Sequence, residues 1–173
     1  HPPQKKKPLQ TTRRQTDGTG ESFAENIITT AQDGPWGCVA DDIDGDGAMD
    51  VACGSNRDNS VIWYENAKGD SLTWTAHVQS TVHSTLSVFA ADVDGDGEDE
   101  IVIATHDYGA VVVLDDFWGS GPVKDTQLDL RVNTYVHEIE LGDVDGDGKL
   151  EFFATPSDPN KSKDTQAGQV VMY

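Results

Sequence analysis

Long apolar runs are missing from this 173-residue sequence. No stretch approaches the roughly 18 uninterrupted apolar residues that a membrane-spanning helix needs, so we expect no membrane span. Apolar residues also do not recur with the 3.6-residue period of an amphipathic helix. The apolar runs that are present are short, and they favour strands over helices.

Cations are scarce outside the N-terminal segment. Residues 1–16 contain five Lys and Arg residues and no acid, whereas the rest of the chain contains seven cations and 31 acids. Nucleic-acid binding needs a basic surface, so the acidic body disfavours a nucleic-acid partner and favours bound cations. Residues 1–22 have the polar, basic composition of a tail without structure of its own.

The sequence has only two cysteines, Cys38 and Cys53. They flank an acidic segment and could face each other across a hairpin. Two apolar thiols in neighbouring strands and a disulfide bond are both compatible with this spacing.

The pattern Asp-x-Asp-Gly-Asp-Gly occurs three times, beginning at Asp42, Asp92 and Asp143. Carboxylates on alternating residues of a tight loop can turn inward together, and glycine permits the positive φ angles that such a loop needs. Ca²⁺ prefers six to eight hard oxygen ligands in a flexible cage. We therefore predict about three Ca²⁺ sites per chain.

Each predicted site has carboxylates at loop positions 1, 3, 5 and 9 and the backbone carbonyl of position 7. The predicted ligands are Asp42, Asp44, Asp46, Ala48 and Asp50 in the first loop, Asp92, Asp94, Asp96, Glu98 and Glu100 in the second, and Asp143, Asp145, Asp147, Lys149 and Glu151 in the third.

Other interpretations of the loop fit less well. An EF-hand requires Glu at position 12, where this chain has Cys53, Ile103 and Ala154. Mg²⁺ prefers fewer carboxylates and more waters, and zinc prefers His or Cys. A plain turn would not need four carboxylates, because two of them about 5 Å apart repel by roughly 3 kcal/mol at an effective dielectric near 20.

Short apolar runs recur around each loop with a period of 50 or 51 residues. They are β-branched or aromatic and end at Gly, Asn, Asp or Ser, which is typical of strands. They lie at 38–40, 88–91 and 139–141 before the loops, at 51–53, 101–104 and 152–154 after them, and at 61–64, 111–114 and 170–173 after a polar turn. A fourth run follows at 73–78 and 127–132, and a spare strand is expected at 23–30.

A period of about 50 residues with four strands per unit is the pattern of β-propeller blades. We predict an all-β fold of three β-propeller-type blades, each a four-stranded antiparallel sheet, the last lacking its fourth strand. The expected division is a polar basic tail (1–22), an N-terminal strand that completes a blade of this chain or of a neighbour (23–34), blade 1 (35–80), blade 2 (81–132) and an incomplete blade 3 (133–173).

Three blades are fewer than the roughly four to eight of a propeller. The chain is therefore expected to be a piece of a longer protein, to pair with a second copy in a six-bladed ring, or to lend its N-terminal strand to a neighbour in an open polymer. The last two alternatives make it a homo-oligomer or polymer formed by strand exchange.

The loops, their flanking strands and their spacing over residues 23–173 resemble the FG-GAP or VCBS repeats of integrin α-chain propellers and many secreted bacterial proteins. Asp42, Asp44, Asp46 and Asp50, with their equivalents, match the ligand positions of that family. The resemblance implies an extracellular or cell-surface location and a role in adhesion, in binding a glycan or protein ligand, or as a scaffold.

Two other functions remain as alternatives to a structural, assembly or adhesion role. A propeller polysaccharide lyase would need a base and a neutralising cation, for which the candidates are His83, His106, His137, Tyr108 and Tyr135. A carbohydrate-binding module would use exposed aromatic rings, and the best candidates are Trp36 and Trp118, both expected in turns. We predict a protein without catalytic residues.

Overall fold

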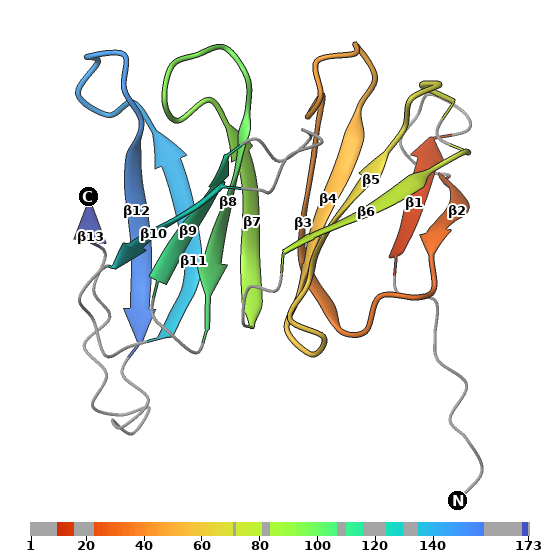
Figure 1. Cartoon of the computed structure of the whole chain (residues 1–173), viewed down its shortest axis with the longest axis horizontal. Coiled ribbons are helices and arrows are strands. Elements are labelled where there is room, and N and C mark those ends of the chain that lie inside the picture. The colour runs from red at the N-terminus through yellow and green to blue at the C-terminus, as the bar shows by residue number, and fades with distance from the viewer. Residues whose placement is uncertain are drawn as a thin grey trace, which may run out of the picture.

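The computed structural model describes residues 10–15, 23–70, 72–80, 84–106, 110–115, 124–129, 135–157 and 171–172. Every regular element in these residues is a β-strand, which confirms the all-β prediction. No helix in the described part is long and apolar enough to cross a membrane. Three antiparallel sheets stand in a row, and a two-stranded hairpin lies at one end of the row (Figure 1).

The three sheets follow the predicted repeats, and we call them blades 1, 2 and 3. Blade 1 has the order β3 (Pro35–Asp41), β4 (Asp50–Ser55), β5 (Val61–Glu65), β6 (Thr75–Ser80). Blade 2 consists of β7 (Thr85–Ala91), β8 (Glu100–Thr105), β9 (Ala110–Asp115) and β10 (Lys124–Asp129). Blade 3 contains β11 (Tyr135–Gly142), β12 (Glu151–Ser157) and β13 (Val171–Met172), with no fourth strand among the described residues.

The N-terminal segment differs from the prediction. Its tail contains a strand, β1 (Gln10–Gln15), which pairs with β2 (Phe23–Thr29) as a hairpin. The expected spare strand is β2, but it lies at the opposite end of the row from blade 3 (Figure 1). The hairpin therefore does not complete the third blade of its own chain.

The fourth strand of blade 2 is also displaced from the prediction. β10 begins at Lys124, three residues before the expected 127–132, because its pairing with β9 starts at the pair Lys124↔Asp115. Residues 130–134 lie outside the described part of the chain.

Blade 2 has an apolar core on each of its faces. One core joins it to blade 1 and includes Ile43, Trp63, Val88 and Ile103, all nearly inaccessible to solvent. The other joins it to blade 3 and includes Val102, Val111, Val136, Ile139 and Ala154. Face-to-face packing of successive blades is thus present throughout the row, as expected for propeller-like sheets.

Two glycines bring blades 1 and 2 together. A Cβ atom on Gly37 would lie 2.5 Å from the carbonyl oxygen of Leu86, and one on Gly54 would overlap the side chain of Thr85. Both contacts are with β7, so β3 and β4 approach that strand closely because they lack side chains there.

The two cysteines form a disulfide bond. Cys38 in β3 and Cys53 in β4 are directly opposed, with a Cα–Cα distance of 4.2 Å. Of the two alternatives left open by the sequence, the structure has the disulfide, which encloses the first acidic loop between its two ends.

Candidate metal centres

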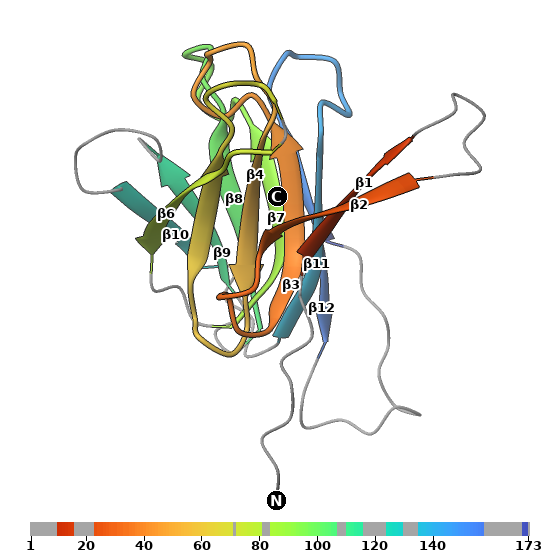
Figure 2. The ribbon, with the colours of Figure 1, turned by 90° about the vertical axis from the view of Figure 1, so that its right-hand side faces the viewer.

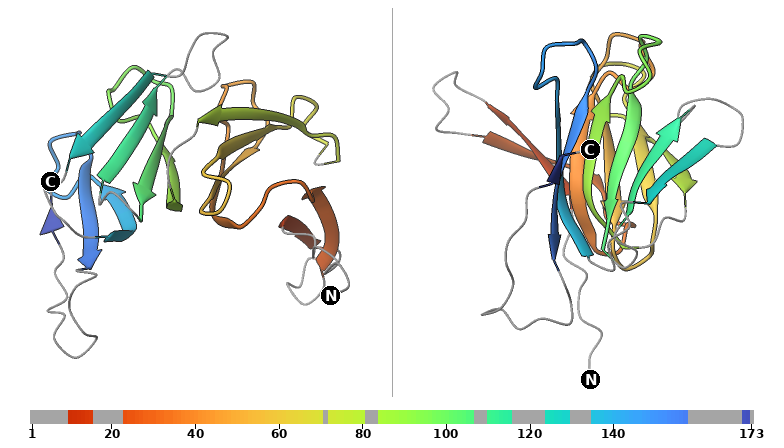
Figure 3. Two further views of the ribbon diagram at one scale, coloured as in Figure 1. Left: turned by 60° about the horizontal axis from the view of Figure 1, so that its bottom comes forward. Right: turned by 90° about the vertical axis from the view of Figure 1, so that its left-hand side faces the viewer.

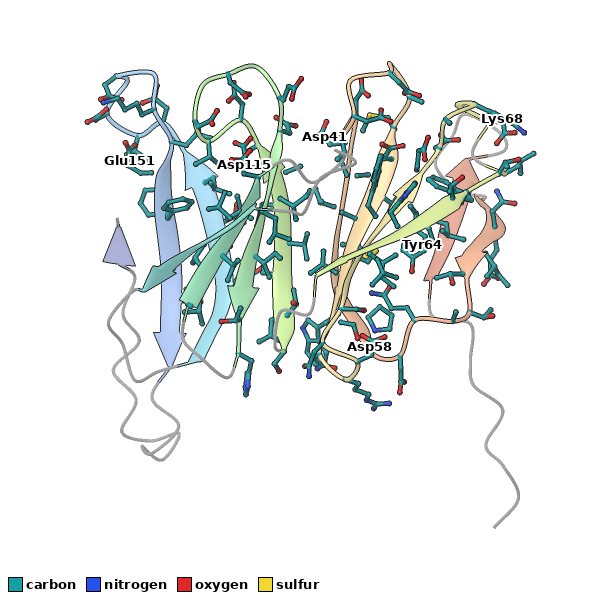
Figure 4. The ribbon with its side chains drawn as sticks, viewed as in Figure 1. Asp41, Asp58, Tyr64, Lys68, Asp115 and Glu151 are labelled. Atoms are coloured by element: carbon teal, nitrogen blue, oxygen red, sulfur yellow. A yellow bond between two sulfur atoms is a disulfide. The ribbon has the colours of Figure 1, made fainter. Side chains whose placement is uncertain are left out.

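The acidic loops connect the first and second strands of the three blades and lie at one end of the molecule. In Figure 4, the labelled Asp41, Asp115 and Glu151 lie toward this end, whereas Asp58 lies at the opposite end. The loops are placed there because each first strand runs in the same sense along the row.

The second loop shows how the sequence pattern produces its conformation. Oδ2 of Asp92 accepts a 3.0 Å bond from the Gly97 N–H, and Oδ1 of Asp94 accepts a 3.1 Å bond from the Asp96 N–H. Gly95 and Gly97 have φ angles of 82° and 95°, the left-handed region that the sequence predicts. The loop therefore folds over its own first carboxylate.

The other two loops repeat these bonds. In the first loop, the Gly47 N–H donates to Asp42 Oδ2 at 3.0 Å and the Asp46 N–H to Asp44 Oδ1 at 3.2 Å. In the third loop, the Gly148 N–H donates to Asp143 Oδ2 at the same 3.0 Å. One local conformation thus recurs wherever the sequence motif recurs.

The carboxylates of each loop gather closely enough to share one ion. Four groups have an oxygen from each member within 4.8 Å of the others: Asp42, Asp44 and Asp46; Asp92, Asp94 and Asp96; Asp94, Glu100 and Asp115; and Asp143, Asp145 and Glu151. Ten of the twelve predicted carboxylates belong to at least one of these groups, Asp115 joins them, and the two predicted carboxylates outside all four groups are Asp50 and Asp147.

Position 9 differs between the loops. Glu100 Oε2 accepts a 2.7 Å bond from the Val93 N–H, and Glu151 Oε2 accepts a 2.8 Å bond from the Val144 N–H. Both glutamates therefore reach back into their loops. Asp50 is one methylene shorter, and its two oxygens accept bonds from Trp63 Nε1 at 2.9 Å and from the Asn66 N–H at 2.8 Å.

Asp50 is thus placed as a buried anchor between blade strands, and the first group contains the other three carboxylates. Asp42 Oδ1 in that group is buried and has no hydrogen-bond partner in the described part of the chain. A buried carboxylate oxygen without a donor is unfavourable unless a cation satisfies it. Together with the oxygen-only donor set, this atom fits a hard divalent cation.

In the third loop, Asp147 Oδ1 accepts a 2.9 Å bond from the Lys149 N–H, as Asp46 and Asp96 do from the residues two positions after them. Asp147 Oδ2 lies 3.8 Å from Lys149 Nζ, in a pair that is largely exposed. The backbone carbonyls of Ala48, Glu98 and Lys149 remain predicted ligands.

Sequence reasoning missed an acid at the end of the third strand. Asp115 ends β9 and joins Asp94 and Glu100 in one group. The equivalent residue of blade 1 is Glu65, the last residue of β5, whose charge raises the pKa of Asp44. The signal was present, because both third apolar runs are followed directly by an acid.

Crowding of these acids perturbs their ionisation. Burial is the main cause that raises the pKa of Asp44, with the nearby charges of Asp46, Glu65 and Asp42 adding to it. Burial likewise raises the pKa of Glu100, and the charges of Asp94 and Asp96 act in the same direction. A bound cation would act in the opposite direction and lower these pKa values, since it favours the ionised form of a carboxyl group.

The residues considered for catalysis or sugar binding do not gather into a site in the described part of the chain. His83, Tyr108 and Trp118 lie outside it, and the side chains of Tyr135 and His137 are not described. His106 follows β8, and its backbone N–H donates to the Ser84 carbonyl. Trp36 lies in strand β3, not in a turn as predicted, and 68% of it is exposed.

Comparison with known protein families identifies an FG-GAP-like repeat at residues 42–103 and again at 92–154. The two matches contain all three acidic loops and most of the strands of the three blades. Comparison with curated proteins finds no match to this chain. The family assignment covers more than half of the sequence and agrees with the β-sheet repeats and acidic loops of the structure, so the chain belongs to the FG-GAP-like repeat family.

Proposed function

We propose that this protein is an extracellular, calcium-binding repeat module whose ions stabilise its blades, and that its role is in assembly or adhesion and not in catalysis. The observation that carries the proposal is the threefold repetition of a loop that gathers carboxylates within 4.8 Å of one another. Ca²⁺ is the ion of choice for such a site because it accepts several carboxylates in an adaptable cage, whereas Mg²⁺ retains most of its waters.

The ion would join the first two strands of a blade. Each loop leaves the first strand and enters the second, and position 9 lies at the start of that second strand. The unfolded chain has no such cage, so binding adds to the free energy of unfolding. At a free Ca²⁺ concentration 100 times the Kd, one site contributes about 2.7 kcal/mol.

An extracellular location agrees with the Cys38–Cys53 disulfide, because such bonds persist in oxidising compartments. The FG-GAP-like repeats fit the same location. A carbohydrate-binding role is the second candidate, since Trp36 exposes an indole ring of the kind that stacks on pyranoses. A glycan array in Ca²⁺ tests this candidate, and absence of binding across the array removes it.

Thermal unfolding with Ca²⁺ and with EGTA tests the main proposal. We expect EGTA to lower the melting temperature of the wild-type protein by several degrees. The matched variants are Asp94→Asn and Glu98→Gln, which remove the same charge from the same loop. Asp94 belongs to two carboxylate groups, whereas Glu98 is predicted to contribute only its backbone carbonyl.

Calorimetric titration should therefore show one site fewer in Asp94→Asn and an unchanged number in Glu98→Gln. Equal weakening in both variants would mean that Ca²⁺ only screens the acidic surface. A melting temperature that EGTA leaves unchanged would contradict the proposal altogether.

A further inference from the structure

The N-terminal hairpin has the strand register of the outer half of a blade. Each of five pairs in β1–β2 lies 51 residues before a pair in β5–β6 of blade 1. The corresponding pairs are Gln10↔Thr29 and Val61↔Ser80, Thr11↔Ile27 and Ile62↔Val78, Thr12↔Asn26 and Trp63↔His77, Arg13↔Glu25 and Tyr64↔Ala76, and Arg14↔Ala24 and Glu65↔Thr75. Both ladders also shift register at the same place, after the first of these pairs.

The offset equals the spacing of the blades, so β1 and β2 correspond to the third and fourth strands of a blade that would precede blade 1. Their position agrees, because the hairpin lies on the side of blade 1 away from blade 2 (Figure 3, left) and projects beyond the sheets at an angle (Figure 2). The first and second strands of that preceding blade are not supplied by the described residues.

The face of blade 1 that such strands would cover is exposed. Within the chain, β7 is packed against β3 and β4, the first and second strands of the blade before it. There Leu86 and Val88 are only 8% and 5% exposed. The residues at the same positions of β3 are Trp36, which is 68% exposed, and Cys38, which is also exposed. The uncovered region thus matches the two strands that the hairpin lacks.

Blade 3 has the complementary deficiency. Its β12 spans Glu151–Ser157, but β13 pairs with only Phe153 and Ala154 of that strand. The second and third strands of blades 1 and 2 share four pairs each. Most of the outer edge of β12 therefore has no strand partner among the described residues, and blade 3 provides the first and second strands, with their acidic loop, that the hairpin lacks.

We infer that β1–β2 of one copy completes blade 3 of a second copy, in a four-stranded sheet with the order β11-β12-β1-β2. This inference rests on the proposed function in assembly and specifies how two copies are connected. We call this shared sheet the joint. By the register of β4–β5, Arg13 would pair with Phe152, Thr12 with Phe153 and Thr11 with Ala154. The six-residue β1 takes the place of the two-residue β13, which leaves the sheet.

Charge favours this partner. Residues 1–16 contain five cations and no acid, and β1 places Arg14 at the register position of the acid Glu65. In the joined sheet that position is at the end of the blade that carries the third acidic loop. Glu138 and Glu140 on β11 are exposed and add to the negative charge of the receiving blade. A cationic strand thus meets an anionic blade.

The joint also gives a closed assembly. A half blade and an incomplete blade combine into one, so each copy contributes three complete blades. Two copies related by a twofold axis then make six, which is within the roughly four to eight of known propellers.

Light scattering on the full chain in Ca²⁺ tests the stoichiometry. The expected mass is twice the 18.7 kDa of one chain. Deleting residues 1–30 should give monomers, and deleting residues 171–173 should strengthen association because β13 no longer competes for β12. A heavier species would overturn closure into a pair.

Cysteine cross-linking tests the register. Thr12→Cys and Phe153→Cys are made in separate chains and mixed under oxidising conditions, where we expect a covalent dimer on non-reducing gels. The control pairs Thr12→Cys with Glu140→Cys, which lies opposite Phe153 on β11, one strand further from β1. Its Cα atoms would be about two strand spacings apart, beyond the roughly 7 Å limit for a disulfide.

Calcium-dependent melting of the same samples separates this inference from the proposed function. A monomer that forms no cross-link and is still stabilised by Ca²⁺ overturns the joint and leaves calcium binding intact. A cross-linked dimer that EGTA does not destabilise supports the joint and overturns the role of calcium.

Discussion

The disulfide across the first acidic loop should make a large contribution to stability. Cys38 and Cys53 are 15 residues apart, and closing a loop of that length in the unfolded chain is worth about 3 kcal/mol. For chains of 150–250 residues, 1 kcal/mol changes the melting temperature by about 2–4 °C. Loss of the bond should therefore lower the melting temperature by about 6–12 °C.

Reduction of the wild-type protein isolates this effect, because it breaks the bond and leaves both sulfur atoms in place. Oxidised and reduced samples are melted in EGTA, so that metal binding does not contribute, and mass spectrometry verifies the thiol state. The double variant Cys38→Ala/Cys53→Ala should melt no higher than the reduced wild-type protein. It should also be insensitive to reductant, which provides the control.

A reduced protein that melts within about 2 °C of the oxidised one would contradict this contribution of the disulfide. Such a result would mean that the strand pair β3–β4 holds the loop closed even in the unfolded ensemble. A loss much above 3 kcal/mol would instead indicate that the bond organises packing in the native blade.

Two further predictions concern packing and pH. Gly54→Ala should destabilise the protein by about 1–3 kcal/mol in urea titrations, because the new methyl group overlaps Thr85 of the next blade. The control Gly142→Ala has nothing within 4 Å of its Cβ and should change stability by less than about 0.5 kcal/mol. Equal effects of the two substitutions would contradict the close approach of the blades. Burial raises the pKa of Asp58, but hydrogen bonds from Ser55, Ser60 and the Asp33 N–H outweigh it and hold that pKa below its usual value. The stabilisation by Asp58 is therefore present above the unfolded pKa near 4 and disappears as the pH decreases through the folded pKa. Asp58→Ala should accordingly be less stable than the wild-type protein at pH 7 and equally stable near pH 2. A stability difference that persists at pH 2 would assign the effect to packing.

The acidic motif predicted much of this fold because it fixes two levels of structure together. Its glycines and carboxylates determine the loop conformation, and its spacing determines where the flanking strands start. For this reason the first and second strands of all three blades lie where the apolar runs predicted them. The same spacing failed to reveal β1, because the half blade at the N-terminus contains no acidic loop with which to align it.

The remaining errors come from interactions that a local pattern does not contain. β1 consists of Thr, Arg and Gln, so its sequence has no apolar alternation that would predict a strand. It is a strand because its backbone pairs with β2. β10 is an outer strand whose start is set by pairing with Asp115 on β9 and not by its own apolar residue, Leu128. Position 9 likewise did not reveal that Trp63 and Asn66 donate hydrogen bonds to both oxygens of Asp50, which stays a predicted ligand.

The two-sided burial of blade 2 distributes stability unevenly along the row. Every residue of β8 is buried, and blade 2 has an apolar core on each face, whereas among the described residues blades 1 and 3 each share such a core with blade 2 alone. In such a linear array, stability is approximately a sum of terms for single repeats and for their nearest-neighbour interfaces. Local opening therefore begins at the outer blades and reaches β8 last, and an additional interface at either end would raise the cooperativity of unfolding as well as its free energy.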